Sequence, residues 1–195
     1  GRENFAPEEY WNIYATSRQV SLIERQVSDF QLDVASELDF IRLKERFINT
    51  KFDVIINFAG IAIAGAVEEL SEIELKKQLD VNLYGLLRVI KYFCPCLKDD
   101  GRLINISSMA SYGIFPFISP YCASKKCLDM LFNSFLIENK KNIKVISIKP
   151  GVISTPLWGK SISENSKFYE KYGDYTEEMN YVLANAKRNE TKGLS

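Results

Sequence analysis

Phe52-Asp-Val-Ile-Ile-Asn-Phe-Ala-Gly60 is the stretch that decides the fold of this chain. Its first six residues form an apolar run of the length expected for a strand buried inside a sheet. The segment Asn57-Phe-Ala-Gly60, which begins with the last residue of that run and ends in glycine, predicts a loop at the carboxyl end of the strand. Such an apolar strand is typical of a parallel sheet, whose strands are joined by helices.

Strand-like and helix-like segments alternate on both sides of this stretch. Strands are predicted at 11–16, 29–34, 52–57, 102–107 and 143–148, and helices at 18–27, 36–48, 72–97 and 121–139, with further helices near 164–172 and 176–188. Ser36 is the predicted N-cap of its helix, and residues 99–101 are a predicted turn. Repeated strand–helix–strand units predict an α/β fold with a doubly wound parallel sheet and helices on both faces.

Polar residues or glycines follow each predicted strand at its carboxyl end. In chain order they are Arg18, Asp33, Asn57-Phe-Ala-Gly60, Ser107-Ser108 and Pro150-Gly151. Sheets of this kind bind their ligands at the carboxyl ends of the strands. We therefore expect a ligand site at this edge of the sheet.

Composition narrows the class of protein. The chain has 195 residues, 46% of them hydrophobic, which suits one compact domain with a substantial core. Its 25 basic and 25 acidic residues balance, so no basic excess indicates nucleic acid as a partner. We find no apolar stretch near the roughly 20 residues of a membrane span and no signal peptide, and we expect a cytoplasmic protein.

The chain contains no histidine, which excludes a Ser-His-Asp triad built from its own residues. Acid/base chemistry must then use Tyr, Lys, Asp, Glu or Cys. The cysteines are Cys94, Cys96, Cys122 and Cys127, and they lack the paired Cys-x-x-Cys spacing of a zinc site. We expect buried free thiols and no metal site.

Tyr121-Cys-Ala-Ser-Lys125 places a tyrosine and a lysine one helical turn apart, on the same face of a helix. A lysine beside a tyrosine favours the phenolate, so the pair is a candidate general acid/base built on a side chain whose ordinary pKa is about 10. Ser108 precedes Tyr121 by 13 residues (121 − 108). The alternative is a solvated lysine next to a packed tyrosine, since this spacing also arises by chance.

Five motifs, in this order and spacing, resemble those of the short-chain dehydrogenase/reductases over about residues 10–158. They are Asn57-Phe-Ala-Gly60, Asn82 within Val81-Asn-Leu-Tyr-Gly85, Ile106-Ser-Ser108, Tyr121-Cys-Ala-Ser-Lys125 and Pro150-Gly-Val-Ile-Ser-Thr155. The resemblance implies a Rossmann-like fold. It also implies an NAD(P)-dependent oxidoreductase that interconverts an alcohol and a ketone or aldehyde.

The same resemblance implies four catalytic residues. Tyr121 would exchange a proton with the substrate oxygen, and Ser108 would hydrogen-bond that oxygen. Lys125 would hydrogen-bond the nicotinamide ribose and lower the pKa of Tyr121, with help from the positive nicotinamide ring of the oxidised cofactor. A shift from about 10 to about 7 requires roughly 4 kcal/mol, which one partly desolvated cation at about 4 Å can supply. Asn82 would break its helix locally and hold a water that links Lys125 to solvent, unless it is a tolerated polar residue.

The resemblance also assigns cofactor-binding residues. They are Arg18, Asp33, Asn57, Ala59, Gly60, Tyr121, Lys125, Pro150, Gly151, Ile153 and Thr155. Arg18 stands where an NAD enzyme of this fold would carry an acidic residue, and an arginine suits a 2′-phosphate, so we expect NADP, with NAD as the alternative. Otherwise Arg18 is a solvated residue at the start of a helix. Asp33 resembles the residue that hydrogen-bonds the adenine amino group, and Ile153 and Thr155 those that hold the carboxamide.

We expect one incomplete dinucleotide-binding and catalytic domain over residues 1–195, with a substrate-covering segment at 158–190. Apolar and aromatic residues gather on the expected substrate side: Phe115, Pro116, Phe117, Ile118, Trp158, Phe168, Tyr169, Tyr172 and Tyr175. They favour an apolar small-molecule alcohol or carbonyl substrate, with plain packing as the alternative. The helices over 72–97 and 121–139 resemble the dimer and tetramer surfaces of the family, so a homodimer or homotetramer is expected.

The match stops short at both ends. The family begins with a strand and a glycine-rich turn that binds the pyrophosphate, and neither that segment nor a final strand is found. Because the first strand is central in this sheet, its neighbours should lack a partner. The chain is then an ordered part of a longer protein, a truncated form or a naturally degenerate chain.

This departure has consequences for binding. The 195-residue chain alone should bind the cofactor weakly, whereas an amino-terminally extended form should bind NADP. A dehydrogenase-like NADP-binding or regulatory protein without turnover is the alternative function. A nucleotide-sugar-modifying relative with the same Tyr/Lys pair is disfavoured by Asn57-Phe-Ala-Gly60.

Overall fold

The computed structural model describes residues 12–18, 28–151, 153, 157, 173–178, 180–181, 184–185 and 188. Its strands all pair in parallel and are β1 (Tyr14–Ser17), β2 (Ser28–Gln31), β3 (Phe52–Asn57), β4 (Leu97–Ile106) and β5 (Lys144–Ile148). The α-helices are α1 (Glu37–Arg46), α2 (Glu72–Leu79), α3 (Gly85–Phe93) and α4 (Ser119–Glu138). The predicted fold class, α/β on parallel strands, is confirmed.

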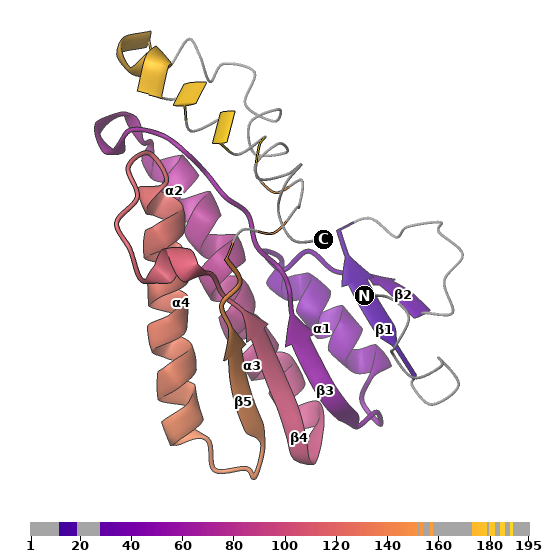
Figure 1. Cartoon of the computed structure of the whole chain (residues 1–195). Coiled ribbons are helices and arrows are strands. Elements are labelled where there is room, and N and C mark those ends of the chain that lie inside the picture. The colour runs from indigo at the N-terminus through magenta and orange to yellow at the C-terminus, as the bar shows by residue number, and fades with distance from the viewer. Residues whose placement is uncertain are drawn as a thin grey trace.

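Three strands form the larger sheet, in the order β3-β4-β5. The helices α1, α3 and α4 lie along one face of it (Figure 1). The register pairs Asn57 with Asn105 and Ile106 with Ile148, so the carboxyl ends of the strands meet at one edge. The helix predicted at 164–172, and all but the first residue of that at 18–27, lie outside the described residues, so helices on the second face stay a prediction.

The strands β1 and β2 form a separate sheet, and within the described residues no ladder joins it to the larger one. Among the residues that the structure describes, β1 pairs with β2 alone and β3 with β4 alone, so β1 and β3 each have one side without a paired strand. The two sheets are held together by aromatic side chains instead, since the Tyr14 ring lies 5.3 Å from that of Phe47 and 5.8 Å from that of Phe52. Over the described part of the chain, this pairing agrees with the prediction that the strands beside the central position lack a partner.

The ends of β1 and β2 differ from the prediction. β1 covers Tyr14–Ser17 rather than 11–16, and β2 ends at Gln31 rather than 34. The cause in β2 is a tight turn at Asp33, whose Oδ1 accepts the Ala35 amide at 2.9 Å and whose carbonyl accepts the Ser36 amide at 2.9 Å. Ser36 caps α1 as predicted, accepting the Asp39 amide on its hydroxyl at 3.3 Å.

The helix predicted at 72–97 is interrupted in the middle. A capping box of Ser71 and Glu74 starts α2, which ends at Leu79, and a π-helical turn covers Asp80–Tyr84 before α3 begins. A 3-10 turn at Cys94–Cys96 then ends the helical region. The predicted local break at Asn82 is therefore confirmed, and it takes the form of a π-bulge, a feature that often marks functional sites.

The predicted turn at 99–101 lies inside β4. Phe52 pairs with Leu97 but Val54 pairs with Arg102, so residues 98–101 bulge out opposite a single residue of β3. Asp100 has a φ of 62°, and a Cβ at Gly101 would lie 2.8 Å from the Lys98 carbonyl oxygen. The backbone thus turns locally, as expected, but the strand continues beyond the turn.

The core packs α1, α3 and α4 against β4. Its most buried members are Phe40, Leu86, Leu103, Leu128 and Phe132. Among the cysteines, Cys94, Cys96 and Cys122 are buried as predicted, and burial raises the pKa of Cys94 to about 12. The prediction is wrong for Cys127, which is exposed because α4 turns Lys125 and Leu128 inward and leaves position 127 on the outer side.

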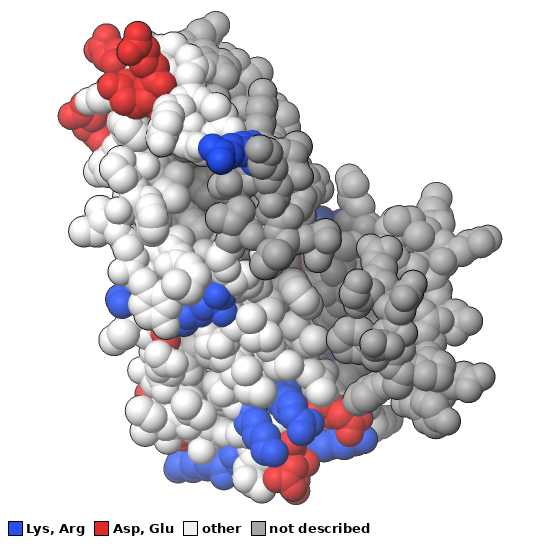
Figure 2. Space-filling model, viewed as in Figure 1, with Lys and Arg blue, Asp and Glu red and all other residues white. Residues whose placement is uncertain are grey.

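Figure 2 shows a group of acidic side chains at the top of this face, separate basic groups over its middle, and basic and acidic side chains mixed at the bottom. Charge therefore does not form one continuous patch on this face.

None of the described helices is long and apolar enough to cross a membrane. The remaining short turns are the 3-10 turns Val67–Glu69, Met109–Ser111 and Gly173–Tyr175, and the described residues among 176–188 are helical as predicted.

Candidate active site

The site is built where β4 ends and α4 begins. Tyr121 and Lys125 lie one turn apart on α4 and are 8% and 4% exposed. The Lys125 ammonium donates to the Ile106 carbonyl at 3.0 Å and lies 5.8 Å from the centre of the Tyr121 ring. The alternative of a solvated lysine beside a packed tyrosine is therefore wrong, because this lysine is buried.

Ser108 meets Tyr121 at the end of β4. Its backbone is extended and caps the 3-10 turn that follows, with the Ala110 amide donating to Ser108 Oγ at 3.1 Å. The Ser108 hydroxyl is also hydrogen-bonded to the Tyr121 side chain. Two residues 13 positions apart in the sequence thus place their hydroxyls together, at the edge of the sheet where a ligand site was expected.

Burial has the largest effect on the pKa values of Tyr121 and Lys125. Burial raises the pKa of Tyr121, and the hydrogen bond with Ser108 only partly opposes this rise. Burial also lowers the pKa of Lys125 to about 8, while the carboxylate of Asp129 favours its charged form. The lowering of the tyrosine pKa that the resemblance implies depends on the oxidised cofactor as well as on Lys125, so it stays a prediction.

Asp129 extends the stripe of Tyr121 and Lys125 by one more turn of α4, and sequence reasoning missed it. It is 6% exposed and pairs with the Lys149 ammonium at 2.9 Å, which in turn donates to the Tyr112 hydroxyl at 2.9 Å. Burial alone would raise the pKa of Asp129, but Ser111, Lys149 and Ser107 lower it below its usual value. An acidic residue four positions after the lysine was the signal that could have identified it.

Asn82 and Gln78, one turn apart, hold the loop after β3. The Asn82 amide accepts from the Ile61 amide at 2.8 Å and donates to the Ile61 carbonyl and to Ser124 Oγ, both at 2.9 Å. Gln78 is fully buried and bonds the Ile63 amide at 2.7 Å and the Ile61 carbonyl at 2.6 Å. Asn82 therefore joins this loop to α4, which is more than a tolerated polar residue would do. Gln78 was missed, although two amides at i and i+4 were a signal.

The loop Asn57-Phe-Ala-Gly60 lies against the same site. Asn57 is buried and donates from Nδ2 to Asn105 Oδ1 on β4 at 2.8 Å. A Cβ at Gly60 would lie 3.5 Å from both Asn82 Oδ1 and Lys125 Nζ, so the absence of a side chain leaves space directly beside the ammonium. The structure thus brings this loop, Asn82 and Lys125 together as predicted.

The other expected cofactor residues lie along the same edge or outside the described part. Pro150 follows β5 and its carbonyl accepts the Met109 amide at 3.0 Å, next to Ser108. A Cβ at Gly151 would meet nothing within 4 Å. Arg18 is exposed at the end of β1, and Asp33 is half-buried after β2. Ile153 is 42% exposed, and Thr155 lies outside the described residues.

Apolar side chains gather beside the first turns of α4, on the expected substrate side. An open hollow of about 350 Å³ next to α4 is lined by Tyr112, Ile114, Phe115 and Cys122 among others. Phe117 has a φ of 61° and its ring lies 5.8 Å from that of Tyr175, which hydrogen-bonds Glu68. The aromatic residues expected at 158, 168, 169 and 172 lie outside the described residues.

Sequence comparison with known proteins identifies the family of this chain. The family model of the short chain dehydrogenases matches residues 10–166. A 3-ketodihydrosphingosine reductase of Bacteroides thetaiotaomicron is 30% identical, covering 83% of this chain and 62% of its own length. An NADPH-dependent 1-acyldihydroxyacetone phosphate reductase of Schizosaccharomyces pombe is 31% identical, covering 83% and 60%. The chain thus spans about three fifths of the length of these curated relatives.

A solved structure of a related protein has the same fold as this chain. The alcohol dehydrogenase from Thermococcus sibiricus, complexed with 5-hydroxy-NADP, is 28% identical and superposes with a TM-score of 0.64 over 68% of this chain and 57% of its own. The Rossmann-like fold implied by the motifs is therefore confirmed. Since the family model covers most of the chain and the motif residues meet at one edge of the sheet, this chain belongs to the short-chain dehydrogenase/reductase family of oxidoreductases.

Proposed function

We propose that the protein is an NADP-dependent oxidoreductase that interconverts an apolar alcohol and its ketone or aldehyde, with Tyr121 as general acid/base. The observation that carries the proposal is the grouping of Ser108 with the buried side chains of Tyr121 and Lys125. Burying a lysine is costly, because it removes a charge from water. Such a group is expected where a reaction needs it, and its pKa of about 8 keeps most of it charged near neutral pH.

In the proposed reaction Ser108 and Tyr121 both hydrogen-bond the substrate oxygen. During reduction of a carbonyl, Tyr121 gives its proton to that oxygen as negative charge develops there. The rise in the pKa of Tyr121 by burial keeps the phenol protonated in the free protein, which suits this donor role. Lys125 stabilises the phenolate that forms. In the oxidative direction the same groups act in reverse.

The residues around Lys125 fit a dinucleotide cofactor. Within the described residues the buried ammonium meets one acceptor, the Ile106 carbonyl, so two of its three N–H groups remain for ribose hydroxyls. The space that a Cβ at Gly60 would fill lies beside this ammonium. NADP, when bound, supplies the hydride chemistry. We assign Asp33 to the adenine amino group and Arg18 to the 2′-phosphate.

Two lines of support favour NADP and an apolar substrate. The relatives include an NADPH-dependent reductase, and two relatives are named for their substrates, a 3-ketodihydrosphingosine and a 1-acyldihydroxyacetone phosphate. The exposed apolar residues Ile114 and Phe115, which line the hollow beside the first turns of α4, would suit the chain of such a substrate. We therefore propose a ketone or aldehyde that carries an extended apolar group.

The test is a hydride-transfer assay with NADPH against a panel of long-chain ketones and aldehydes. It compares Tyr121→Phe with wild type, using the 195-residue chain and the same chain preceded by a strand and a glycine-rich turn. We expect turnover by wild type and a loss of at least about 100-fold in Tyr121→Phe. Equal rates for wild type and Tyr121→Phe would refute the catalytic role of Tyr121. Cofactor binding without turnover would favour the alternative of a regulatory protein.

We also propose self-association through α3 and α4. Their outer faces expose the apolar residues Leu87, Met130, Leu131 and Ile137 among the described residues. A homodimer or homotetramer would cover them. Light scattering should give a mass of two or four chains, and Met130→Lys combined with Ile137→Lys should shift it toward one.

A further inference from the structure

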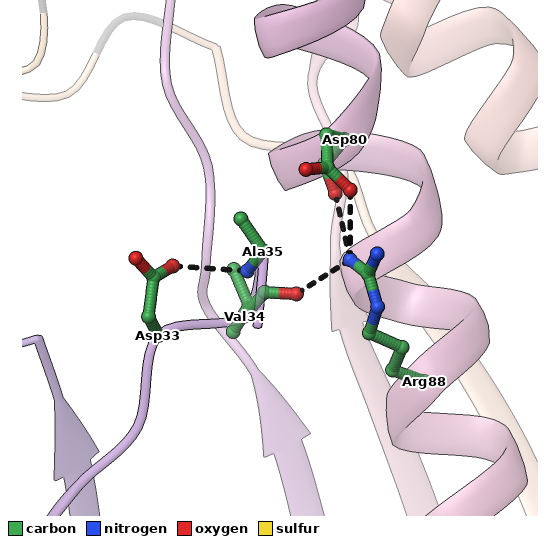
Figure 3. Close-up of polar contacts among 5 residues, drawn as sticks. All are labelled: Asp33, Val34, Ala35, Asp80 and Arg88. Carbon is green, nitrogen blue, oxygen red and sulfur yellow. Dashed lines mark hydrogen bonds and ion pairs between the residues drawn. The ribbon is translucent and has the colours of Figure 1, made fainter. Parts of the chain in front are cut away.

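Arg88 on α3 reaches across to the loop that follows β2. Its Nη1 donates to the Val34 carbonyl at 2.8 Å and pairs with Asp80 Oδ1 at 2.9 Å. Figure 3 shows Arg88 pointing from the helix toward the loop, with Asp80 above it on the π-helical turn. The Arg88 side chain is 20% exposed, so this contact is made in a largely desolvated place.

The loop that receives Arg88 carries Asp33. One oxygen of Asp33 accepts the Ala35 amide at 2.9 Å, and Figure 3 shows the other oxygen directed away from Ala35. The Asp33 amide donates to Asp39 Oδ2 at 3.0 Å. These bonds shape the turn within itself, but they do not fix its place relative to α3. Among the described residues, the hydrogen bond that joins this loop to α3 comes from Arg88. Its acceptor is the carbonyl of Val34, the residue directly after Asp33.

A second contact, between Gly85 of α3 and the Val34 side chain, also holds this loop against the helix. A Cβ at Gly85, one turn before Arg88, would lie 3.2 Å from both Cβ and Cγ2 of Val34. The loop therefore packs directly on the helix backbone at Gly85 and is held down by Arg88. Because Asp80 belongs to the π-helical turn that contains Asn82, this clamp joins the Asp33 loop to the segment that supports the catalytic lysine.

We propose that Arg88 is a positioning residue, which with Asp80 fixes the Asp33 loop so that the Asp33 carboxylate meets the amino group of the adenine ring. The inference rests on the proposed function, since it assumes the assignment of Asp33 to adenine. It goes beyond that function by naming the residues that set recognition of the base. Arg88 touches neither the substrate nor the reacting atoms, and its effect should appear in base recognition.

The test compares equilibrium binding of NADP with that of its hypoxanthine analogue, which has an oxo group in place of the adenine amino group. Dissociation constants are measured by protein fluorescence for the 195-residue chain and for the amino-terminally extended form. In wild type the analogue should bind about 10-fold more weakly, because a hydrogen bond to a carboxylate is lost. In Arg88→Met that ratio should fall to within about 2-fold, while Arg88→Lys should retain an intermediate ratio.

Two further variants sharpen the result. Gly85→Ala keeps every charge but pushes Val34 away, and it should also reduce the ratio. Lys76→Met removes an exposed ion pair with Glu72 on α2 and should leave the ratio unchanged. Hydrogen exchange of the amides of residues 33–36, measured without cofactor, should be at least about 10-fold faster in Arg88→Met than in wild type.

The outcomes separate the two proposals. If wild type discriminates between the two cofactors and Arg88→Met discriminates equally well, the role of Arg88 is overturned and the proposed function stands. Unchanged exchange of residues 33–36 in Arg88→Met overturns it as well. If wild type binds NADP in neither form, the proposed function fails, and the inference fails with it.

Discussion

Replacing Lys125 by methionine should change the stability of the fold in a way that depends on pH. Lys125 is 4% exposed, and burial lowers its pKa from 10.5 to about 8. This difference corresponds to about 3 kcal/mol by which the folded state disfavours the charged form relative to the unfolded state. Methionine has a similar length and no charge, so Lys125→Met removes this cost.

The sign follows from proton binding. Between pH 8 and 10.5 the unfolded chain binds more protons at Lys125 than the folded chain, so this group makes wild-type stability rise with pH. Below pH 8 both states hold the proton and the cost is constant. The variant lacks this dependence. Its stability relative to wild type should therefore fall by about 3 kcal/mol as pH rises from 8 to 10.5.

The absolute difference at neutral pH is smaller than this. The variant leaves the Ile106 carbonyl without the hydrogen bond from Lys125, at a cost of about 1 to 3 kcal/mol. That cost does not change with pH. The change in the difference between the two proteins across the pH range isolates the buried charge.

Urea denaturation followed by circular dichroism at pH 7, 8, 9 and 10.5 would measure both proteins. Lys126→Met, at the next and exposed position of α4, is the matched control and should differ from wild type by a constant amount. A stability difference for Lys125→Met that stays constant over this range would refute the argument, because Lys125 would then titrate as in the unfolded chain.

Three other predictions concern the groups around the site. Asp129→Asn removes the carboxylate that favours the charged form of Lys125, so the pKa of Lys125 should fall further below about 8; NMR titration of labelled lysine checks this, and an unchanged value would contradict it. Gln78→Leu should destabilise the chain by about 1 to 3 kcal/mol, because the Ile63 amide loses its partner; urea denaturation measures the loss, and equal stability would show that the loop does not depend on Gln78. NADP titration by calorimetry should show weak or no binding to the 195-residue chain and clear binding to the extended form, so tight stoichiometric binding by the short chain would contradict the role given to the glycine-rich turn.

Much of the fold could be predicted because its signals are local. The apolar run 52–57 became β3 with the same bounds, and Ser36 caps α1, since burial pattern and capping chemistry depend on a few neighbouring residues. The turn at Asp33 and the bulge at 98–101 shifted strand ends, because side-chain hydrogen bonds and ladder register compete with strand propensity. Cys127 was wrongly predicted to be buried, because a shift of one position along a helix decides whether a side chain faces the core or the solvent.

The motif residues of the site were predictable, but their electrostatics were not. Ser108, Tyr121 and Lys125 meet as their spacing indicated, because a strand end and a helix start fix them. The raised pKa of Tyr121 depends on burial that no spacing reports. Asp129, Lys149 and Arg88 act through contacts between distant segments, and a single sequence does not show which segments those are.

The most direct test of the proposed chemistry follows a labelled hydride. NADPH deuterated at the transferred position of the nicotinamide ring is incubated with a long-chain ketone and the amino-terminally extended protein, and the alcohol is analysed by mass spectrometry. Wild type should give an alcohol with one deuterium at the carbinol carbon, and Tyr121→Phe should give none above the enzyme-free blank. Equal deuterium incorporation by the two proteins would contradict the account, because the proton would then reach the substrate oxygen without Tyr121.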